Sequence, residues 1–303
     1  MQISSYSKYA TGTFDIDNLQ QSIQSLQEQL DTQQRVNKPS DDPVAATQIL
    51  QISQSSGRNT QFVSNSQNVK SQLGLVDTAL GNTANLLASM KSLVVQAGNG
   101  TLSAPQLQMM QQQVNQDLNE LLNYGNATDG RGDYLMGGNK INNVPFSFNG
   151  TQYVYNGDSG QRQVQITDTR SLPVSLDGSQ AFGNAADPAA LLNAVQTFST
   201  LLGQNPKPAT YQTQLNAVMS SLDNAQQQIL TTQASVGAAE QENNNTLSSN
   251  QGLSVQYQDA IGNLQSLDLP KAISDFTMAQ TSLQYSQLTY TKVTQLSLFN
   301  YIQ

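Results

Sequence analysis

The chain has 303 residues, a net charge of -8 and only 11% charged residues, and it contains no histidine, cysteine or tryptophan. The lack of histidine and cysteine excludes a His-based general base, a thiolate nucleophile and a Cys/His metal site. No Lys/Arg cluster supplies the basic footprint of nucleic-acid binding, and no apolar run approaches the roughly 20 residues that span a membrane.

The N-terminal segment is predicted to form an amphipathic helix. Its opening, MQISSYSKYATGTFD, lacks the apolar core of a Sec-type signal peptide, so export of the chain would use another route. The apolar residues that follow alternate at spacings of three and four, which places them on one helix face. They are Ile16, Leu19, Ile23, Leu26 and Leu30.

The stretch QRVNKPSDDPVAA places two carboxylates directly before a proline. Asp42 followed by Pro43 is the pattern of an N-cap with proline in the first helical position, and the helix dipole also favours the neighbouring Asp41. An acid/base pair or a metal site would need a pocket and an electrophile-stabilising partner, and nothing nearby supplies one. The stretch therefore predicts a helix start, with contacts to a neighbouring subunit as an open alternative.

Two proline-free stretches, between Pro43 and Pro105 and between Pro208 and Pro270, are predicted to be long helices. Apolar residues alternate three and four apart in both, which is typical of helices packed along a seam. A shorter helix is expected from about Pro105 to Asn126, with Ser103 as its N-cap. The second long helix contains a polar gap, which predicts a weak or hydrated layer in the seam or a local break. The gap consists of Asn243, Thr246 and Asn250.

From Asp129 to about Gly183 the composition shifts to Val, Tyr, Phe, Thr and Ile. The Asn-Gly pairs at 149–150 and 156–157 are the strongest short hairpin signal, so a small inserted β domain is predicted. The turn NGDSG at 156–160 has a single Asp, which favours a plain turn over a calcium loop. A helix is expected to resume with Asp187 as N-cap and Pro188 in the first helical position.

The C-terminal segment is predicted to be a second single amphipathic helix. Its stripe is Phe276, Ala279, Leu283, Ser286, Tyr290 and Val293. Isolated helices are marginal in water, so the two end helices should pair with each other or stay disordered until a partner covers them.

Several stretches resemble the family of bacterial flagellins and flagellar junction proteins. RVNKPSDDPVAA looks like the N-terminal signature of that family, and SLDLPKAISDFTMAQTSLQYSQLTYTKVTQLSLFNYI is similar to its C-terminal assembly helix. The β-domain stretch VPFSFNGTQYVYNGDSGQRQVQI is more like a junction protein than a filament subunit. The resemblance assigns an assembly motif and an assembly and chaperone-binding helix. The motif is Arg35, Asn37, Asp41, Asp42 and Pro43, and the helix residues are Phe276, Leu283, Tyr290, Val293, Leu298 and Phe299.

The resemblance implies a mainly α fold, an elongated antiparallel helical bundle built from the N- and C-terminal halves with a small inserted β domain. It places terminal assembly helices, disordered in the free monomer, at 1–43 and 268–303, a helical rod at 44–128 and 185–267, and the β domain at 129–184. The implied protein is extracellular, a structural part of the flagellum between hook and filament, without cofactors. Its implied partners are further copies in a ring, the hook-side junction protein, flagellin and a cytosolic export chaperone.

Other functions remain as alternatives from the sequence. The first is flagellin itself, the filament subunit, which polymerises over long lengths. The second is an adhesin, because Arg131-Gly132-Asp133 spells an integrin-binding tripeptide, although such a tripeptide arises easily by chance. An enzyme is disfavoured, because the protease inserts of some flagellins need metal ligands and this chain has no histidine.

Overall fold

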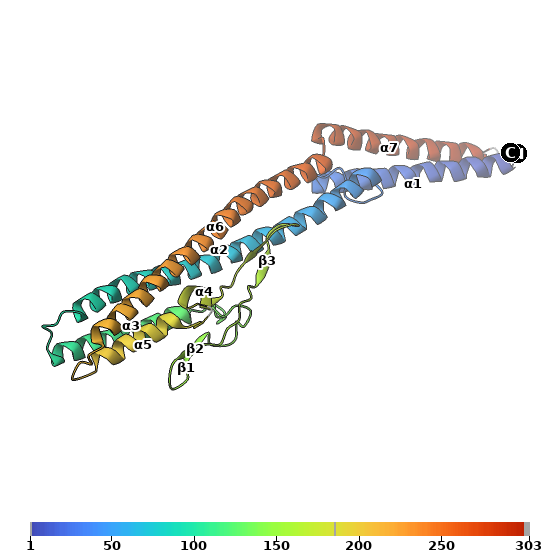
Figure 1. Ribbon diagram of the computed structural model, residues 1–303. Helices are drawn as coiled ribbons and strands as arrows, with labels where there is room; N and C mark the ends of the chain where they lie inside the picture. The colour runs from blue at the N-terminus through green and yellow to red at the C-terminus, as the bar shows by residue number, and fades with distance from the viewer. Residues whose placement is uncertain (1, 185, 300–303) are drawn as a thin grey trace. The chain divides into compact units, whose positions relative to one another are not determined.

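The computed structural model describes residues 2–184 and 186–299, and helix side chains at 2–6, 8 and 295–299 are outside that description. The elements confirm a mainly α fold with a small β insert (Figure 1). Contacts divide the chain into two compact units, Met1–Arg58 with Leu253–Gln303, and Asn59–Gly252. The elements are α1 (Gln2–Thr32), α2 (Pro43–Ala97), α3 (Ala104–Gly125), β1 (Phe146–Phe148), β2 (Tyr153–Tyr155), β3 (Gln163–Gln165), β4 (Ser171–Pro173), α4 (Gly178–Phe182), α5 (Ala190–Leu202), α6 (Tyr211–Gln265) and α7 (Leu269–Phe299).

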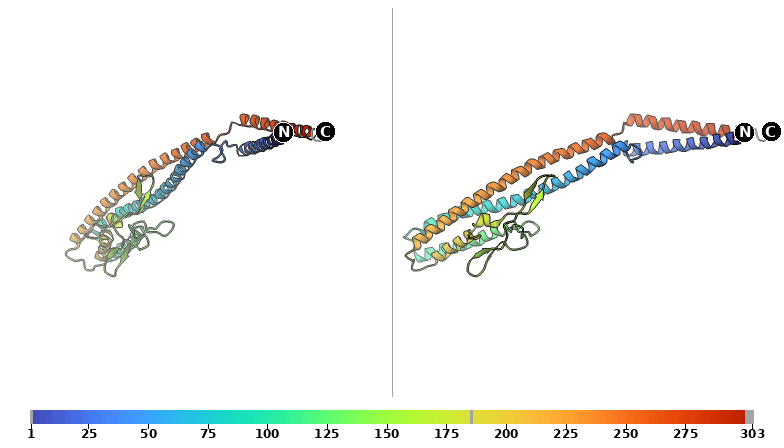
Figure 2. Two further views of the ribbon diagram at one scale, coloured as in Figure 1. Left: turned by 90° about the vertical axis from the view of Figure 1, so that its right-hand side faces the viewer. Right: turned by 45° about the vertical axis from the view of Figure 1, so that its right-hand side comes forward.

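Within the unit Asn59–Gly252, α2 and α6 form the seam that the apolar alternation predicts. Leu80 and Ile229 of this seam are fully buried. α3 and α5 pack on each other and lie side by side in both views of Figure 2. Residues that come later along α2 contact residues that come earlier along α6, which confirms an antiparallel bundle. These contacts join Asn243 Nδ2 to the Ser66 carbonyl at 2.8 Å, Gln233 Nε2 to Asp77 Oδ1 at 2.9 Å, and Lys91 Nζ to Asp223 Oδ1 at 2.5 Å.

The polar gap in the second long helix is not a break. α6 continues through Asn243, Thr246 and Asn250, and all three residues are buried. The amide of Asn250 donates to the carbonyl of Ile166 at 3.0 Å, and the amide of Asn59 on α2 donates to the carbonyl of Asn250 at 2.7 Å. Buried amides that find carbonyl partners are compatible with a tight interior. The layer is therefore ordered by hydrogen bonds and joins α2, α6 and the β insert.

Replacing Asn250 by alanine should destabilise this layer, because the buried carbonyl of Ile166 loses the amide donor. We expect the free energy of unfolding to fall by about 1–3 kcal/mol in urea denaturation. Asn244→Ala is the matched control, since Asn244 is exposed on the same helix, and it should change stability by less than about 0.5 kcal/mol. Equal effects of the two substitutions would contradict a structural role for the Asn250 amide.

The β insert contains two separate antiparallel hairpins, β1–β2 and β3–β4. The first Asn-Gly pair forms the predicted hairpin turn: Gly150 has a φ of +97°, and Asn149 Oδ1 accepts the backbone N–H groups of Thr151 and Gln152, each at 3.0 Å. The second hairpin prediction is wrong, because Asn156-Gly157 follows β2 in a loop. There the Asn156 N–H donates to the Pro145 carbonyl at 2.7 Å and extends the β1–β2 ladder by one residue pair, whereas the next strand, β3, pairs with β4 and not with β2.

Side-chain amides attach both hairpins to helices. Asn65 of α2 donates to the carbonyl of Gln165 at 2.7 Å. Asn193 of α5 contacts the edge of β2 as a neighbouring strand would: its Oδ1 accepts the Tyr153 N–H at 2.7 Å, and its Nδ2 donates to the Tyr153 carbonyl at 3.1 Å. This pairing occupies polar groups that an edge strand otherwise leaves open.

The predicted start of α3 is confirmed, whereas that of α5 is wrong by two residues. Ser103 is the N-cap of α3 as expected, and Gln106 Oε1 accepts its backbone N–H at 2.9 Å. α5 begins at Ala190 instead of Pro188, because Asp187 Oδ1 accepts the N–H of Ala189 at 3.0 Å and closes a turn before the helix.

In the other unit, α1 and α7 lie side by side along their lengths (Figure 1). The rings of Tyr9 and Tyr290 meet edge to face, with centroids 6.3 Å apart, and the Tyr290 ring also lies over Gly12. The end helices are thus paired with each other, which is the first of the two arrangements expected for them. This contact buries few side chains: among the described side chains of α1 and α7, only Ala272 is buried.

Candidate functional site

The loop between α1 and α2 contains the sequence motif and begins α2 with a cap. The chain leaves α1 after Thr32 through Gln33, which has a φ of 57°. α2 begins at Pro43, and Asp42 Oδ1 accepts the N–H of Ala45 at 3.0 Å. This backbone hydrogen bond, followed by that from the Arg35 guanidinium, lowers the pKa of Asp42. Asp42 thus acts as a helix cap.

Asp41 has a different role from the one expected. Its Oδ2 accepts the backbone N–H groups of Asn37 and Lys38, at 3.0 and 2.9 Å, so it closes the loop rather than α2. Asn37 in turn contacts the end of α1, because its Oδ1 accepts the Thr32 hydroxyl at 2.9 Å, and its Nδ2 donates to the Gln34 carbonyl at 3.3 Å. Asp41 and Asn37 together fix the path of the loop.

Arg35 connects this loop to the end of α6, more than 220 residues later in the chain. Its backbone N–H donates to the Gln265 carbonyl at 2.8 Å, and its Nη2 donates to the Leu264 carbonyl at 3.0 Å. Its Nη1 pairs with Asp42 Oδ2 at 2.8 Å. A cation at the C-terminal end of a helix interacts favourably with the exposed carbonyls and the helix dipole. We call Arg35, Asp42, Leu264 and Gln265 the terminal clamp.

The bonds of the terminal clamp join segments of the backbone, so it is a structural site. The side chains of Arg35 and Asp42 are 44% and 30% exposed, so their ion pair lies at the surface. Within residues 2–184 and 186–299, no group of three His, Cys, Asp or Glu residues is placed to hold a metal ion. None of the helices in that part of the chain is long and apolar enough to cross a bilayer.

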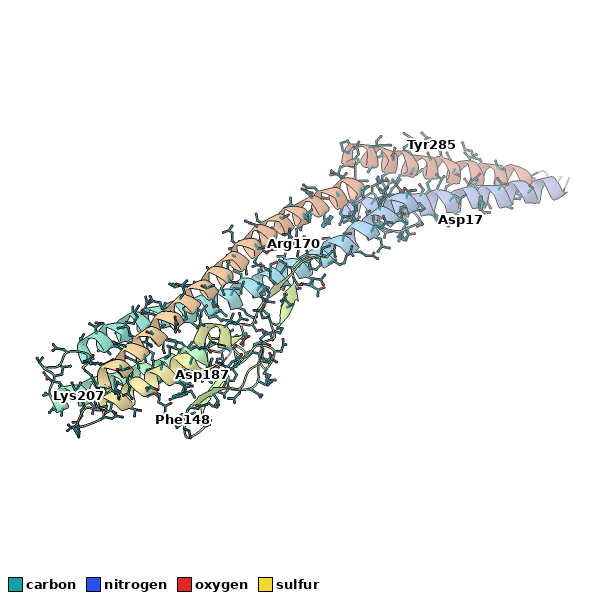
Figure 3. The ribbon with its side chains drawn as sticks, in the orientation of Figure 1. Asp17, Phe148, Arg170, Asp187, Lys207 and Tyr285 are labelled. Atoms are coloured by element: carbon teal, nitrogen blue, oxygen red, sulfur yellow. The ribbon has the colours of Figure 1, made fainter. Side chains whose placement is uncertain are left out.

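The predicted assembly residues of α7 do not form one exposed stripe. Phe276, Leu283 and Tyr290 are half-buried on the face toward α1, whereas Val293 is 44% exposed. The side chains of Leu298 and Phe299 lie outside the described residues. A different apolar set on α7 is well exposed, and Figure 3 labels one of its members, Tyr285. This set is Ile273, Met278, Tyr285 and Leu288.

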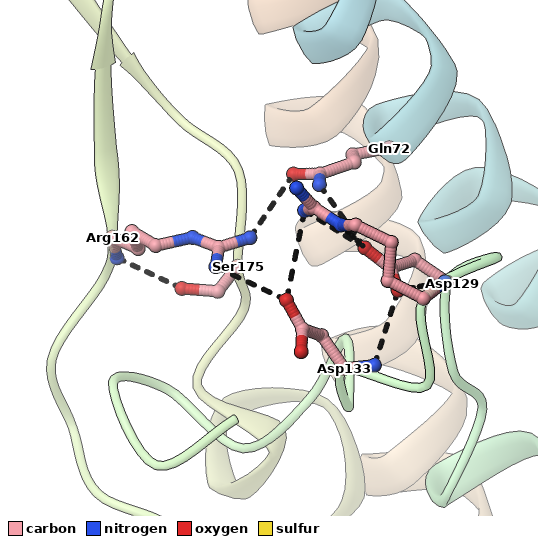
Figure 4. A network of polar contacts seen from close by, with 6 residues as sticks. Gln72, Asp129, Asp133, Arg162 and Ser175 are labelled. Carbon is pink, nitrogen blue, oxygen red and sulfur yellow. Dashed lines mark hydrogen bonds and ion pairs between the residues drawn. The ribbon is translucent and has the colours of Figure 1, made fainter. Parts of the chain in front are cut away.

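The Arg-Gly-Asp tripeptide lies in a network of charges next to α2 (Figure 4). Arg131 Nη2 lies 3.0 Å from Asp129 Oδ2 and 3.6 Å from Asp133 Oδ2, and Arg162 Nη1 lies 3.4 Å from the same Asp133 oxygen. Burial raises the pKa of Asp129, but hydrogen bonds from the Arg131 and Asp133 backbone and from the Arg131 side chain outweigh it, so the pKa is lowered overall. Both charged side chains of the tripeptide are engaged within the chain, which does not favour an adhesin.

These features define a mainly helical chain with a small β insert and no metal cluster among its described residues. Residues 3–141 match the bacterial flagellin N-terminal helical region. Over its full length the chain is similar to flagellar hook-associated protein 3: it is 27% identical to that of Salmonella typhimurium and 28% identical to that of Escherichia coli, covering 99% of each chain. Flagellin of Bacillus subtilis matches less well, at 25% identity over 90% of this chain.

A solved structure shows the same fold. The crystal structure of flagellar hook associated protein-3 from Legionella pneumophila superposes with a TM-score of 0.64 at 20% identity, over 71% of this chain and 98% of that one. The full-length relatives confirm the resemblance to the flagellar junction proteins that the sequence motifs indicate, and they match better than the flagellin of Bacillus subtilis does.

Proposed function

We propose that the chain is a structural subunit of the bacterial flagellum that forms the junction between hook and filament, on which flagellin assembles. The observation that carries this proposal is the similarity to hook-associated protein 3 across 99% of the chain, the β insert included. Flagellin remains the alternative, because the chain also matches a flagellin at lower identity. We propose no catalytic role.

The partners follow from the same proposal. Copies of the chain form a ring that contacts the hook-side junction protein on one side and flagellin on the other. The protein reaches this extracellular position through the flagellar type III route. A cytosolic chaperone covers α7 before export, and the exposed apolar residues Met278 and Tyr285, 64% and 67% exposed, offer it a surface.

The domains have separate roles in the proposal. Residues 1–43 and 268–303 serve assembly, 44–128 and 185–267 form the helical rod, and 129–184 form the β domain. α1 and α7 become ordered on assembly, which is supported by their lack of a buried core. A helix pair with so little buried apolar surface has little stability of its own.

Deletion of the gene tests the function. Electron microscopy of the deletion strain should show hooks without filaments, and flagellin should appear in the culture medium. Hooks with missing or shortened filaments and no shed flagellin would identify the chain as the filament subunit instead. Normal filaments in the deletion strain would overturn both assignments.

A further inference from the structure

We propose that the terminal clamp is the anchor from which α1 and α7 pair: Arg35 holds the two segments in register, and the pairing extends outward from it toward the chain ends. The anchor itself is a property of the free chain. Only its consequence, that subunits order their end helices outward from a preset point as they join the flagellum, rests on the proposed function.

Burial within this unit is concentrated beside the clamp. Val36 directly follows Arg35 and is 6% exposed, and Ala45 lies in the first turn of α2 at 4%. Ala272 lies in the first turn of α7, also at 4%. Toward the far ends of α1 and α7, the described side chains are half-buried at most, as are the edge-to-face rings of Tyr9 and Tyr290. Local stability follows buried contacts, so it should be highest at the clamp and fall along both helices.

The clamp also ties together the two points from which the end helices depart. Gln34 and Ser266 form an antiparallel β-bridge, so the α1–α2 loop pairs with the α6–α7 connection. Asp268 then starts α7, because its Oδ1 accepts the N–H of Lys271 at 3.1 Å. Fixing both departure points raises the effective concentration of one helix for the other and lowers the entropy cost of closing the contact.

Arg35 is the positioning residue in this arrangement. Its guanidinium bonds both to the α6 carbonyl of Leu264 and to Asp42 at the start of α2. Lys38 in the same loop instead pairs with Glu28 of α1 at 2.5 Å, a contact within the N-terminal segment alone. Only Arg35 of the two therefore links the N-terminal to the C-terminal part of the unit, and Lys38 offers a matched control.

Hydrogen exchange of the purified full-length chain tests the anchor. In the natural chain we expect protection to be highest in peptides that contain Arg35, Gln265 and Ala272, and to decrease along α1 and α7 away from them. R35Q should speed exchange about tenfold at both segments of the clamp, and in adjacent turns of α1 and α7, as expected for lost hydrogen bonds to a charged group. K38Q should leave the α7 side unchanged.

Several outcomes would overturn the proposal. They are uniform protection along α1 and α7, unprotected clamp peptides in the natural chain, and R35Q effects confined to the N-terminal segment or equal to those of K38Q. If R35Q also speeds hydrogen exchange in residues 59–252, the D42N variant provides the deciding test of the anchor. It removes the charge of the ion pair with Arg35 and keeps a side-chain oxygen for the helix cap. D42N should then increase the exchange rate in both the α1–α2 loop and the α6–α7 connection, by less than R35Q does. An unchanged exchange rate in the α6–α7 connection would refute the anchor. None of these results depends on the flagellar assignment.

Discussion

Replacing Phe146 by alanine is expected to lower the free energy of unfolding of the Asn59–Gly252 unit by about 3–5 kcal/mol. Phe146 is 1% exposed, and its ring packs against those of Tyr155 and Phe182, each with centroids 5.1 Å away. The ring also fits against Gly125 of α3, where an added Cβ would come within 2.9 Å of it. Truncation would leave a cavity where β1 meets α3 and α4.

Tyrosine fluorescence during denaturation can follow this unfolding, because the chain has no tryptophan to mask the tyrosine signal and Tyr155 lies next to the site. Phe148→Ala is the control in the same strand, since Phe148, labelled in Figure 3, is 49% exposed and its ring lies tilted against that of Tyr153, with centroids 5.2 Å apart. That substitution should cost less than about 1 kcal/mol. A comparable loss in both variants would contradict the assignment of Phe146 to the core of the insert.

The long helices could be predicted from the sequence because their signal is repetitive. Leu80 and Ile229 belong to an alternation that runs for many turns, and both are fully buried as expected. The polar gap was harder to interpret. Asn250 breaks the apolar pattern, and its carbonyl partner, Ile166, comes from a distant hairpin. A local pattern cannot indicate a partner 84 residues away in sequence, so the gap resembled a weakness.

The hairpins show the same limit at a smaller scale. Asn149-Gly150 lies between two strands that pair with each other, whereas Asn156-Gly157 lies between β2 and β3, which belong to different strand pairs. An Asn-Gly pair allows the chain to reverse direction, but it does not determine whether the flanking segments pair. That pairing depends on what the following segment packs against. Here β3 pairs with β4 and is attached to α2 by Asn65, so the second Asn-Gly pair remains in a loop.

The candidate site was predicted only in its local part. Asp42 before Pro43 is a short-range pattern, and its capping bond to Ala45 is short-range as well. The bonds of Arg35 to the α6 carbonyls were missed, because backbone acceptors leave no residue-type signal in the sequence. Asp41 was assigned to the helix dipole for the same reason: its true partners are the backbone N–H groups of its own loop.

A stripe on the outer face of α6 is proposed to contact neighbouring copies of the chain. α6 has no Lys or Arg, and the stripe is an exposed row of uncharged residues opposite the buried seam. In a ring the same contact is repeated between every pair of neighbouring subunits. A negative charge added to this surface would therefore be repelled at each contact by the same added charge or by another carboxylate on the neighbouring subunit. The stripe consists of Asn224, Gln227, Thr231, Ala234, Ala238, Gln241 and Asn245.

The double substitution Thr231→Glu and Ala238→Glu should therefore abolish filament growth in a complemented deletion strain, while the purified chain unfolds within about 0.5 kcal/mol of the natural protein per site. Both residues are exposed and lie on one face of α6, and glutamate is a good helix former. The control carries glutamine at both positions, with the same size and no charge, and should support normal filaments and motility. Normal filaments from the glutamate variant would show that this face of α6 does not contact neighbouring subunits. Equal failure of the glutamine variant would trace the defect to side-chain size, since the charge is then the only difference between the two proteins.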